Sequence, residues 1–82
     1  MLIERVLLRD LRQEGERMSA VVICHAGNRQ VSILASIPRQ TDPAPALVEE
    51  ALHRLRALSG PQSDARHATL APGAPIEIDA GA

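Results

Sequence analysis

The sequence predicts a single α+β domain, built as a three-stranded antiparallel β-meander with one amphipathic helix packed on one face and followed by a partly ordered Ala/Gly/Pro-rich tail. Three observations support it. Alternating apolar segments flank a glycine turn within residues 18–37, apolar residues recur at helical spacing within residues 47–58, and a chain of 82 residues has room for one core. We expect residues 1–60 to form the βββα domain and residues 61–82 to form the tail.

The first expected strand covers residues 2–12 and leads into a turn at Gly15. Its apolar residues also fit helical spacing, so the β-branched content and the neighbouring hairpin decide in favour of a strand. A two-residue and a three-residue loop would place Arg5 and Arg9 on opposite faces. We expect a three-residue loop, because it puts Val6 and Leu8 on the core face and turns both arginines away.

A β-hairpin over residues 18–37 is the clearest local prediction. Gly27 and Asn28 tolerate the positive φ of a two-residue turn, and both flanks are rich in β-branched residues. This turn sets a register in which every pair on one face is apolar: Cys24 with Val31, Val22 with Ile33, Ala20 with Ala35, and Met18 with Ile37. A shift of the pairing by one residue would place apolar residues of one strand opposite polar residues of the other.

The helix is expected to begin in Thr41–Pro45, where Asp42 can cap free N–H groups and prolines are tolerated in the first turn. The residues at 3-4 spacing form one apolar stripe that needs a sheet to cover it: Leu47, Val48, Ala51, Leu52, Leu55 and Leu58. Glu49 and Glu50 precede His53 and Arg54 by four residues, which favours ion pairs along the helix. Ser59-Gly60-Pro61 predicts its end.

The tail contains two short apolar islands, residues 68–70 and 76–78. Either island could add an edge strand, although Pro72 and Pro75 limit how far such pairing extends.

Composition and charge exclude several classes of function. The chain has no Phe, Tyr or Trp, so its core is thin and association with another surface is favoured. A net charge of −1 with interleaved signs gives no overall attraction to nucleic acid or to a membrane, and no apolar run approaches the ~20 residues of a membrane span. The lone Cys24 cannot form an internal disulfide and suits the cytoplasm.

No residue pattern predicts catalysis, a cofactor or a metal. Cys24 and His25 are adjacent, but neighbours on a strand point to opposite faces, which works against a thiol–imidazole pair. The three histidines, His25, His53 and His67, lack ligand spacing. We therefore expect a non-catalytic protein without cofactor or metal.

The second face of the sheet gives the main functional hypothesis. Val21, Ile23 and Leu34 should lie there, together with Leu7 of the first strand, flanked by serines and His25. One helix covers one face only, so these four residues are candidates for a protein interface. Ile3 and Leu11 of the first strand should be exposed on the same face. Alternatively, residues 67–78 fold back and cover this face. We expect an interaction or assembly module that is homo-oligomeric or a small subunit of a larger complex.

The alternative is binding of nucleic acid or another polyanion through arginine. Five arginines occur in the expected meander and could hold phosphates if they shared one face: Arg5, Arg9, Arg12, Arg17 and Arg29. Interleaved carboxylates and the missing aromatic residues weigh against this alternative.

Overall fold

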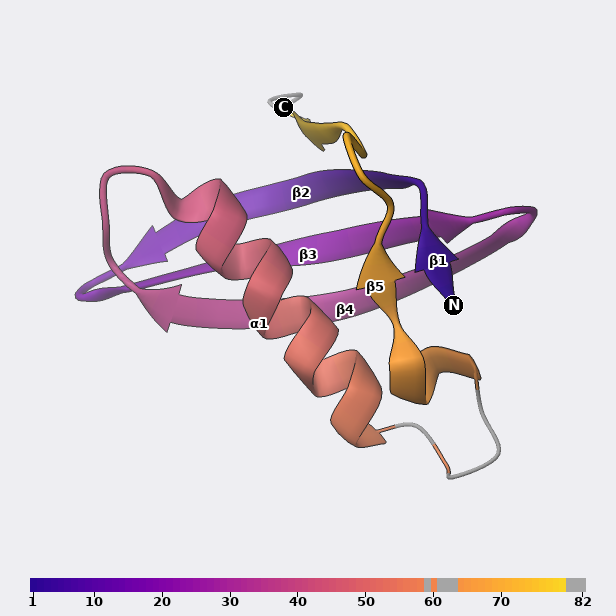
Figure 1. Cartoon of the computed structure of the whole chain (residues 1–82). Coiled ribbons are helices and arrows are strands. Elements are labelled where there is room, and N and C mark those ends of the chain that lie inside the picture. Colours follow the sequence, from indigo (N-terminus) through magenta and orange to yellow (C-terminus); the bar gives the residue numbers. More distant parts are fainter. Residues whose placement is uncertain (59, 61–63, 80–82) are drawn as a thin grey trace.

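The computed structural model describes residues 1–58, 60 and 64–79, which form two layers (Figure 1). One layer is a sheet in which β2 (Arg5–Glu14), β3 (Arg17–Ala26) and β4 (Arg29–Pro38) are joined as an antiparallel meander. Helix α1 (Pro43–Leu58) packs on one face of that sheet. The predicted α+β fold is thus confirmed.

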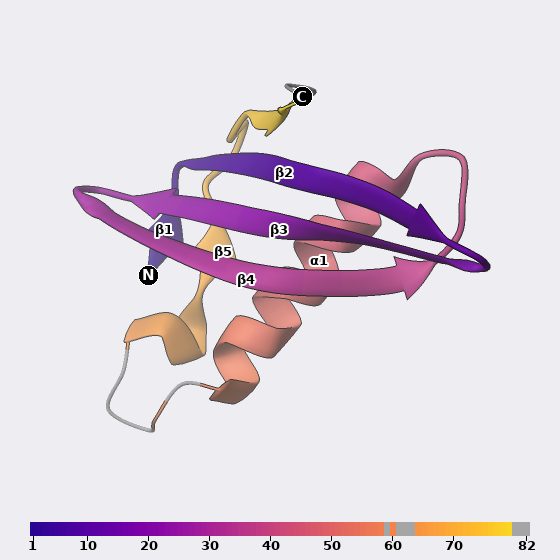
Figure 2. The same cartoon turned by 180° about the vertical axis from the view of Figure 1, so that it is seen from behind.

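The tail contributes more regular structure than a single edge strand. After the short helix η1 (Asp64–His67), β5 (Thr69–Leu70) pairs in parallel with β1 (Leu2–Ile3), and β6 (Ile76–Ile78) pairs in parallel with β2. The main sheet therefore has the order β4-β3-β2-β6. Figures 1 and 2 show β1 and β5 on the same side of this sheet as α1, so the helix and the small strand pair share the covering of one face.

The β3–β4 hairpin has the predicted register. Cys24 lies opposite Val31, and the other three predicted pairs are also present. Gly27 has a φ of 63°, which the first central residue of a type II′ turn requires and which glycine adopts without strain. Turn chemistry and side-chain alternation thus specify the same pairing.

The first strand differs from its prediction in two respects. It is interrupted at Glu4, so that β1 leaves the main sheet and Ile3, expected on the exposed face, is completely buried in the core. The turn after β2 has two residues, Gly15 and Glu16, instead of three, because Glu14 pairs with Arg17.

A β-bulge in β2 compensates for the short turn. Arg9 lies opposite Val21 and Arg12 opposite Ser19. Between these pairs β2 therefore has two residues where β3 has one, which defines a β-bulge. Asp10 in this bulge has a φ of 55°, a left-handed conformation that Asp tolerates better than most residues. The bulge pairs Val6 with Cys24 and Leu8 with Val22, so both lie on the core face as predicted, and it leaves Arg5 and Arg9 facing away from the core.

The core lies between the sheet and the layer formed by α1, β1 and η1. Among the described residues, its buried members are aliphatic side chains, alanines and one cysteine. Its buried residues come from both sides of the predicted boundary at residue 60: Ile3, Val6, Leu8, Ala20, Val22, Cys24, Ala35, Ile37, Leu47, Val48, Ala51, Leu52, Leu55, Ala65 and Ala68.

Helix α1 begins at Pro43, directly after Asp42, as predicted. Its buried stripe ends at Leu55, whereas Leu58, predicted to belong to it, is 78% exposed. Figure 1 shows the reason, since the C-terminal part of α1 extends beyond β4 and has no sheet below it. Arg54 Nε lies 3.1 Å from Glu50 Oε1, the predicted i,i+4 ion pair. Ser59 and Pro61 of the predicted helix end lie outside the described residues.

Candidate protein interface

The face of the main sheet opposite α1, called the outer face below, has no covering element in the part of the chain that the structure describes. Figure 2 shows β2, β3 and β4 from this side with nothing in front of them. Strand alternation places Leu7, Val21, Ile23 and Leu34 here, since their neighbours Val6, Val22 and Leu8 point into the core. The structure therefore brings the four sequence-predicted interface residues to one face.

These four side chains differ in how far water reaches them. Leu34 on the edge strand β4 is 61% exposed, and Val21 opposite it is half-buried. Ile23, however, is only 4% exposed, although it was expected to be open to solvent. Ile23 lies on the central strand β3 between Leu7 and Ser32, and side chains on the flanking strands shield a central position more than an edge position. The accessible apolar surface is thus centred on Leu34 and Val21.

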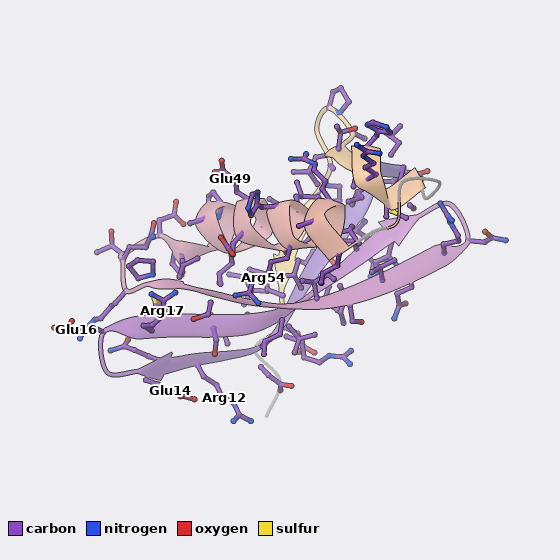
Figure 3. The ribbon with its side chains drawn as sticks, turned by 90° about the horizontal axis from the view of Figure 1, so that it is seen from below. Arg12, Glu14, Glu16, Arg17, Glu49 and Arg54 are labelled. Carbon is purple, nitrogen blue, oxygen red and sulfur yellow. The ribbon has the colours of Figure 1, made fainter. Side chains whose placement is uncertain are left out.

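A hollow of about 260 Å³ lies beside Leu34 and Val21. It is further lined by Ser19 of β3 and by three charged residues around the bulge: Asp10, Arg12 and Glu14. Figure 3 shows Arg12 and Glu14 projecting from β2 away from α1. The sequence does not predict this hollow, because it exists only where the bulge turns Asp10 and Arg12 onto the outer face, and the sequence carries no direct signal for a bulge.

Small polar residues surround the apolar surface on the β4 side. Ser32 and Ser36 occupy the outer-face positions on either side of Leu34, and Ser19 lies opposite Ser36. Arg17 donates from Nε to Ser36 Oγ and from its terminal nitrogen to the Ser36 carbonyl oxygen, both at 3.0 Å. Since serine side chains are short, they leave Leu34 as the main projection on this strand.

Carboxylates from the tail accompany two of the five candidate arginines. Arg5 Nε lies 3.5 Å from Glu77 Oε2, and Arg9 Nε lies 3.7 Å from Asp79 Oδ2. These pairs reduce the positive potential of β2, which weakens the case for a phosphate-binding surface.

Of the remaining candidate arginines, Arg12 and Arg17 lie on the outer face with Arg5 and Arg9, and Arg29 does not. Arg17 is at the start of β3 beside Pro38, whereas Arg29 is at the opposite end of the hairpin beside Ala26, about 30 Å away at the usual rise of a strand. The register also places Arg29 on the face that carries Val31 and α1, whereas Arg17 shares the outer face with Ser19. Four of the five candidate arginines therefore share the outer face, where the carboxylates of Asp10, Glu14, Glu77 and Asp79 lie among them, and only Arg29 lies on the other face.

The adjacent Cys24 and His25 point to opposite sides of β3. Cys24 is buried in the core, where burial raises the pKa of its thiol, while His25 lies half-buried across from Arg5. A thiol with a raised pKa is a poor nucleophile near neutral pH. This geometry offers no support for a thiol–imidazole pair.

Residues 1–58, 60 and 64–79 contain neither a metal-binding cluster nor a membrane-spanning helix. No three His, Cys, Asp or Glu side chains come together there in a way that could hold a metal ion. His25, His53 and His67 lie on β3, α1 and η1. Within the same residues, no helix has the length and apolar character required to cross a membrane.

The comparisons with known proteins found no family model, no curated protein and no solved structure that matches the chain.

Proposed function

We propose that this protein is a non-catalytic assembly module that associates with a second copy of itself through the outer face. The observation that carries this proposal is the exposure of Leu34 at the centre of β4, next to Val21, on a sheet face that no described element covers. Exposed apolar surface of this kind, rimmed by polar residues, is typical of interaction sites. A cytoplasmic location is part of the proposal, supported by a single cysteine held as a buried thiol.

The shape of the outer face favours a second copy as the partner. Leu34 projects directly beside the hollow lined by Asp10, Arg12 and Glu14. Around a twofold axis, each protomer can insert Leu34 into the hollow of the other, because such an interface uses the same patch twice. The hollow carries carboxylates and a guanidinium, so two copies need not repel one another. The short serines beside Leu34 allow two sheets to approach to the usual ~10 Å.

The size of the core supports the same proposal. A domain of about 80 residues buries a smaller fraction of its unfolded surface than a larger domain does, and this one has no aromatic side chains. Burying the outer face in a dimer would add apolar contacts that a second helix supplies in larger domains.

The solution mass of the untagged protein tests this proposal, measured by light scattering coupled to size-exclusion chromatography over a wide concentration range and at two salt levels. We expect a dimer at high concentration. Leu34→Arg should weaken the dimer by at least about tenfold, the effect of removing a central interface side chain. Leu58→Arg is the matched control, because Leu58 is also exposed but lies on α1.

A monomeric wild-type protein at every concentration would contradict the proposal. So would a dimer that Leu34→Arg leaves intact, because its interface would then lie elsewhere. Circular dichroism of both variants shows whether the fold is kept, which separates loss of association from unfolding. Binding to heparin that is independent of salt would exclude the arginine alternative as well.

A further inference from the structure

The edge of β2 that does not pair with β3 binds β6, and the same pairing can form between two molecules. β6 pairs in parallel with β2, with Ile76 opposite Val6, Glu77 opposite Leu7 and Ile78 opposite Leu8. Hydrogen bonds bracket this pairing, because Val6 donates to the Pro75 carbonyl oxygen at 2.9 Å and Asp79 donates to that of Leu8 at 2.8 Å. The β2 edge is therefore a defined acceptor for one short extended segment.

The acceptor recognises an alternating pattern of side chains. On the outer face, Arg5 and Arg9 face Glu77 and Asp79. On the other face, Ile76 joins Val48, Leu52 and Leu70 in lining a hollow of about 360 Å³ beside α1. The edge thus selects an extended segment in which apolar and acidic residues alternate. The bulge at Asp10 distorts β2 directly beyond Leu8, so a longer strand could not continue the same pairing.

The chain's own segment occupies this site loosely. Ile76 and Ile78 remain 37% and 51% exposed, and both ion pairs lie at the surface, where water and salt weaken them. A β-turn precedes the segment, in which Ala74 donates to the Ala71 carbonyl oxygen at 3.0 Å and Gly73 has a φ of 73°. Opening of this exposed turn would release β6 and leave the sheet and α1 in place.

We propose that β6 is exchangeable, and that the β2 edge of one protomer binds residues 76–79 of a second copy. Every backbone and charge contact made within one chain can be made equally between two chains, which is the condition for domain swapping. The exchange uses the edge of β2 rather than Leu34, so it is independent of the proposed outer-face dimer.

Two charge-reversed full-length proteins test this exchange. In the acceptor variant, Arg5→Glu and Arg9→Glu place carboxylates opposite Glu77 and Asp79. In the donor variant, Glu77→Arg and Asp79→Arg place arginines opposite Arg5 and Arg9. Each variant repels its own segment, but each segment fits the edge of the other variant. All proteins also carry Leu34→Arg, so that association through the outer face does not obscure the result.

We expect each variant alone to be monomeric and their equimolar mixture to form a heterodimer of twice the chain mass, detected by native mass spectrometry. The protein with all four reversals is the control, because its pairs are restored within one chain and it should behave as the Leu34→Arg parent does. A mixture that stays monomeric while this control remains folded would overturn the proposal. Self-association of either variant alone would show that these charges do not decide which segment the β2 edge binds.

Deletion of Pro72 and Gly73 provides a second test that leaves the charges unchanged. Without the turn, β6 can no longer reach the β2 edge of its own chain, so only exchange can fill that edge. We expect this deletion variant to be a dimer that dissociates when a peptide of residues 74–79 is added in excess. A monomeric, folded deletion variant, or a dimer that the peptide leaves intact, would contradict the proposal.

Discussion

Val6 lies opposite Cys24 in the sheet, although the two-residue turn at Gly15 and Glu16 would by itself place Val6 opposite His25. The bulge between Arg9 and Arg12 absorbs the difference of one residue. Without it, Val6 and Leu8 would point out of the core and Arg5 and Arg9 would point in, because a shift of one residue reverses the faces of a strand. The conformation of Asp10 therefore decides which side chains of β2 are buried.

The first prediction concerns this conformation. Replacing Asp10 by Val, which is β-branched and disfavours a positive φ, should lower the free energy of unfolding by about 1–2 kcal/mol. Asp10→Gly removes the same carboxylate but accepts the φ, so it should be neutral or stabilising by up to ~1 kcal/mol. Urea denaturation of the three proteins measures both effects. Equal stability of the Val and Gly variants would show that the bulge is not held at Asp10.

The second prediction compares two leucines of α1. Leu47 is fully buried and Leu58 is 78% exposed, although both belong to the predicted apolar stripe. Leu47→Ala should reduce the free energy of unfolding by about 2–5 kcal/mol through lost burial and a cavity. Leu58→Ala should change it by less than ~0.5 kcal/mol, as is usual at the surface. Thermal unfolding followed by circular dichroism distinguishes these values, and a large effect at Leu58 would place it inside an interface.

The third prediction concerns the thiol of Cys24, whose pKa is raised by burial. The folded state keeps the thiol proton at a pH where the unfolded chain loses it. This contribution to stability is fully present below the unfolded pKa of about 8.5 and decreases as the pH rises towards the higher folded pKa. The chain has no Lys or Tyr to titrate in this range. Cys24→Ala should therefore flatten the dependence of the unfolding free energy on pH above ~8.5.

Alkylation of Cys24 gives an independent measure of its burial. Iodoacetamide should modify the native protein far more slowly than the urea-unfolded chain at the same pH, because the reactive thiolate is disfavoured in the core. Equal rates in the two states would contradict the position of Cys24.

The fourth prediction compares two arginines of α1. Arg56 Nε donates to the Ala68 carbonyl oxygen at 2.8 Å in a partly buried position, which connects α1 to the segment before β5. Arg54 Nε instead bonds Glu50 on the exposed helix surface. Arg56→Met should cost about 1–2 kcal/mol, and Arg54→Met about 0.3–0.5 kcal/mol. Chemical denaturation of both variants tests this order, and the reverse order would contradict the role of Arg56.

The meander and helix could be predicted because local and long-range signals agree. The turn at Gly27, the alternation around Val22 and the stripe at Leu47 all favour the same arrangement. The bulge at Asp10 could not be predicted, since a three-residue loop at Gly15 accounts for the same side-chain pattern. The burial of Ile3 was equally hidden, because it depends on pairing with residues far along the chain.

The candidate interface was predictable in position but not in shape. Alternation along β3 and β4 predicts that Val21, Ile23 and Leu34 share a face, and they do. The sequence does not reveal that Ile23 is shielded, nor that the bulge creates a hollow beside Leu34. Both features arise from the packing of side chains on neighbouring strands, and the alternation of residues along one strand does not specify that packing.

The pairing of Ile3 with Leu70 also sets an order of events during synthesis. Ile3 is made well before Leu70, so β1 has no strand partner until residues 69–70 emerge from the ribosome. The hairpin of β3 and β4 needs only local contacts and can form well before that point. We therefore expect nascent chains halted before Ala65 to be sensitive to proteases, and chains that extend past Leu70 to become resistant.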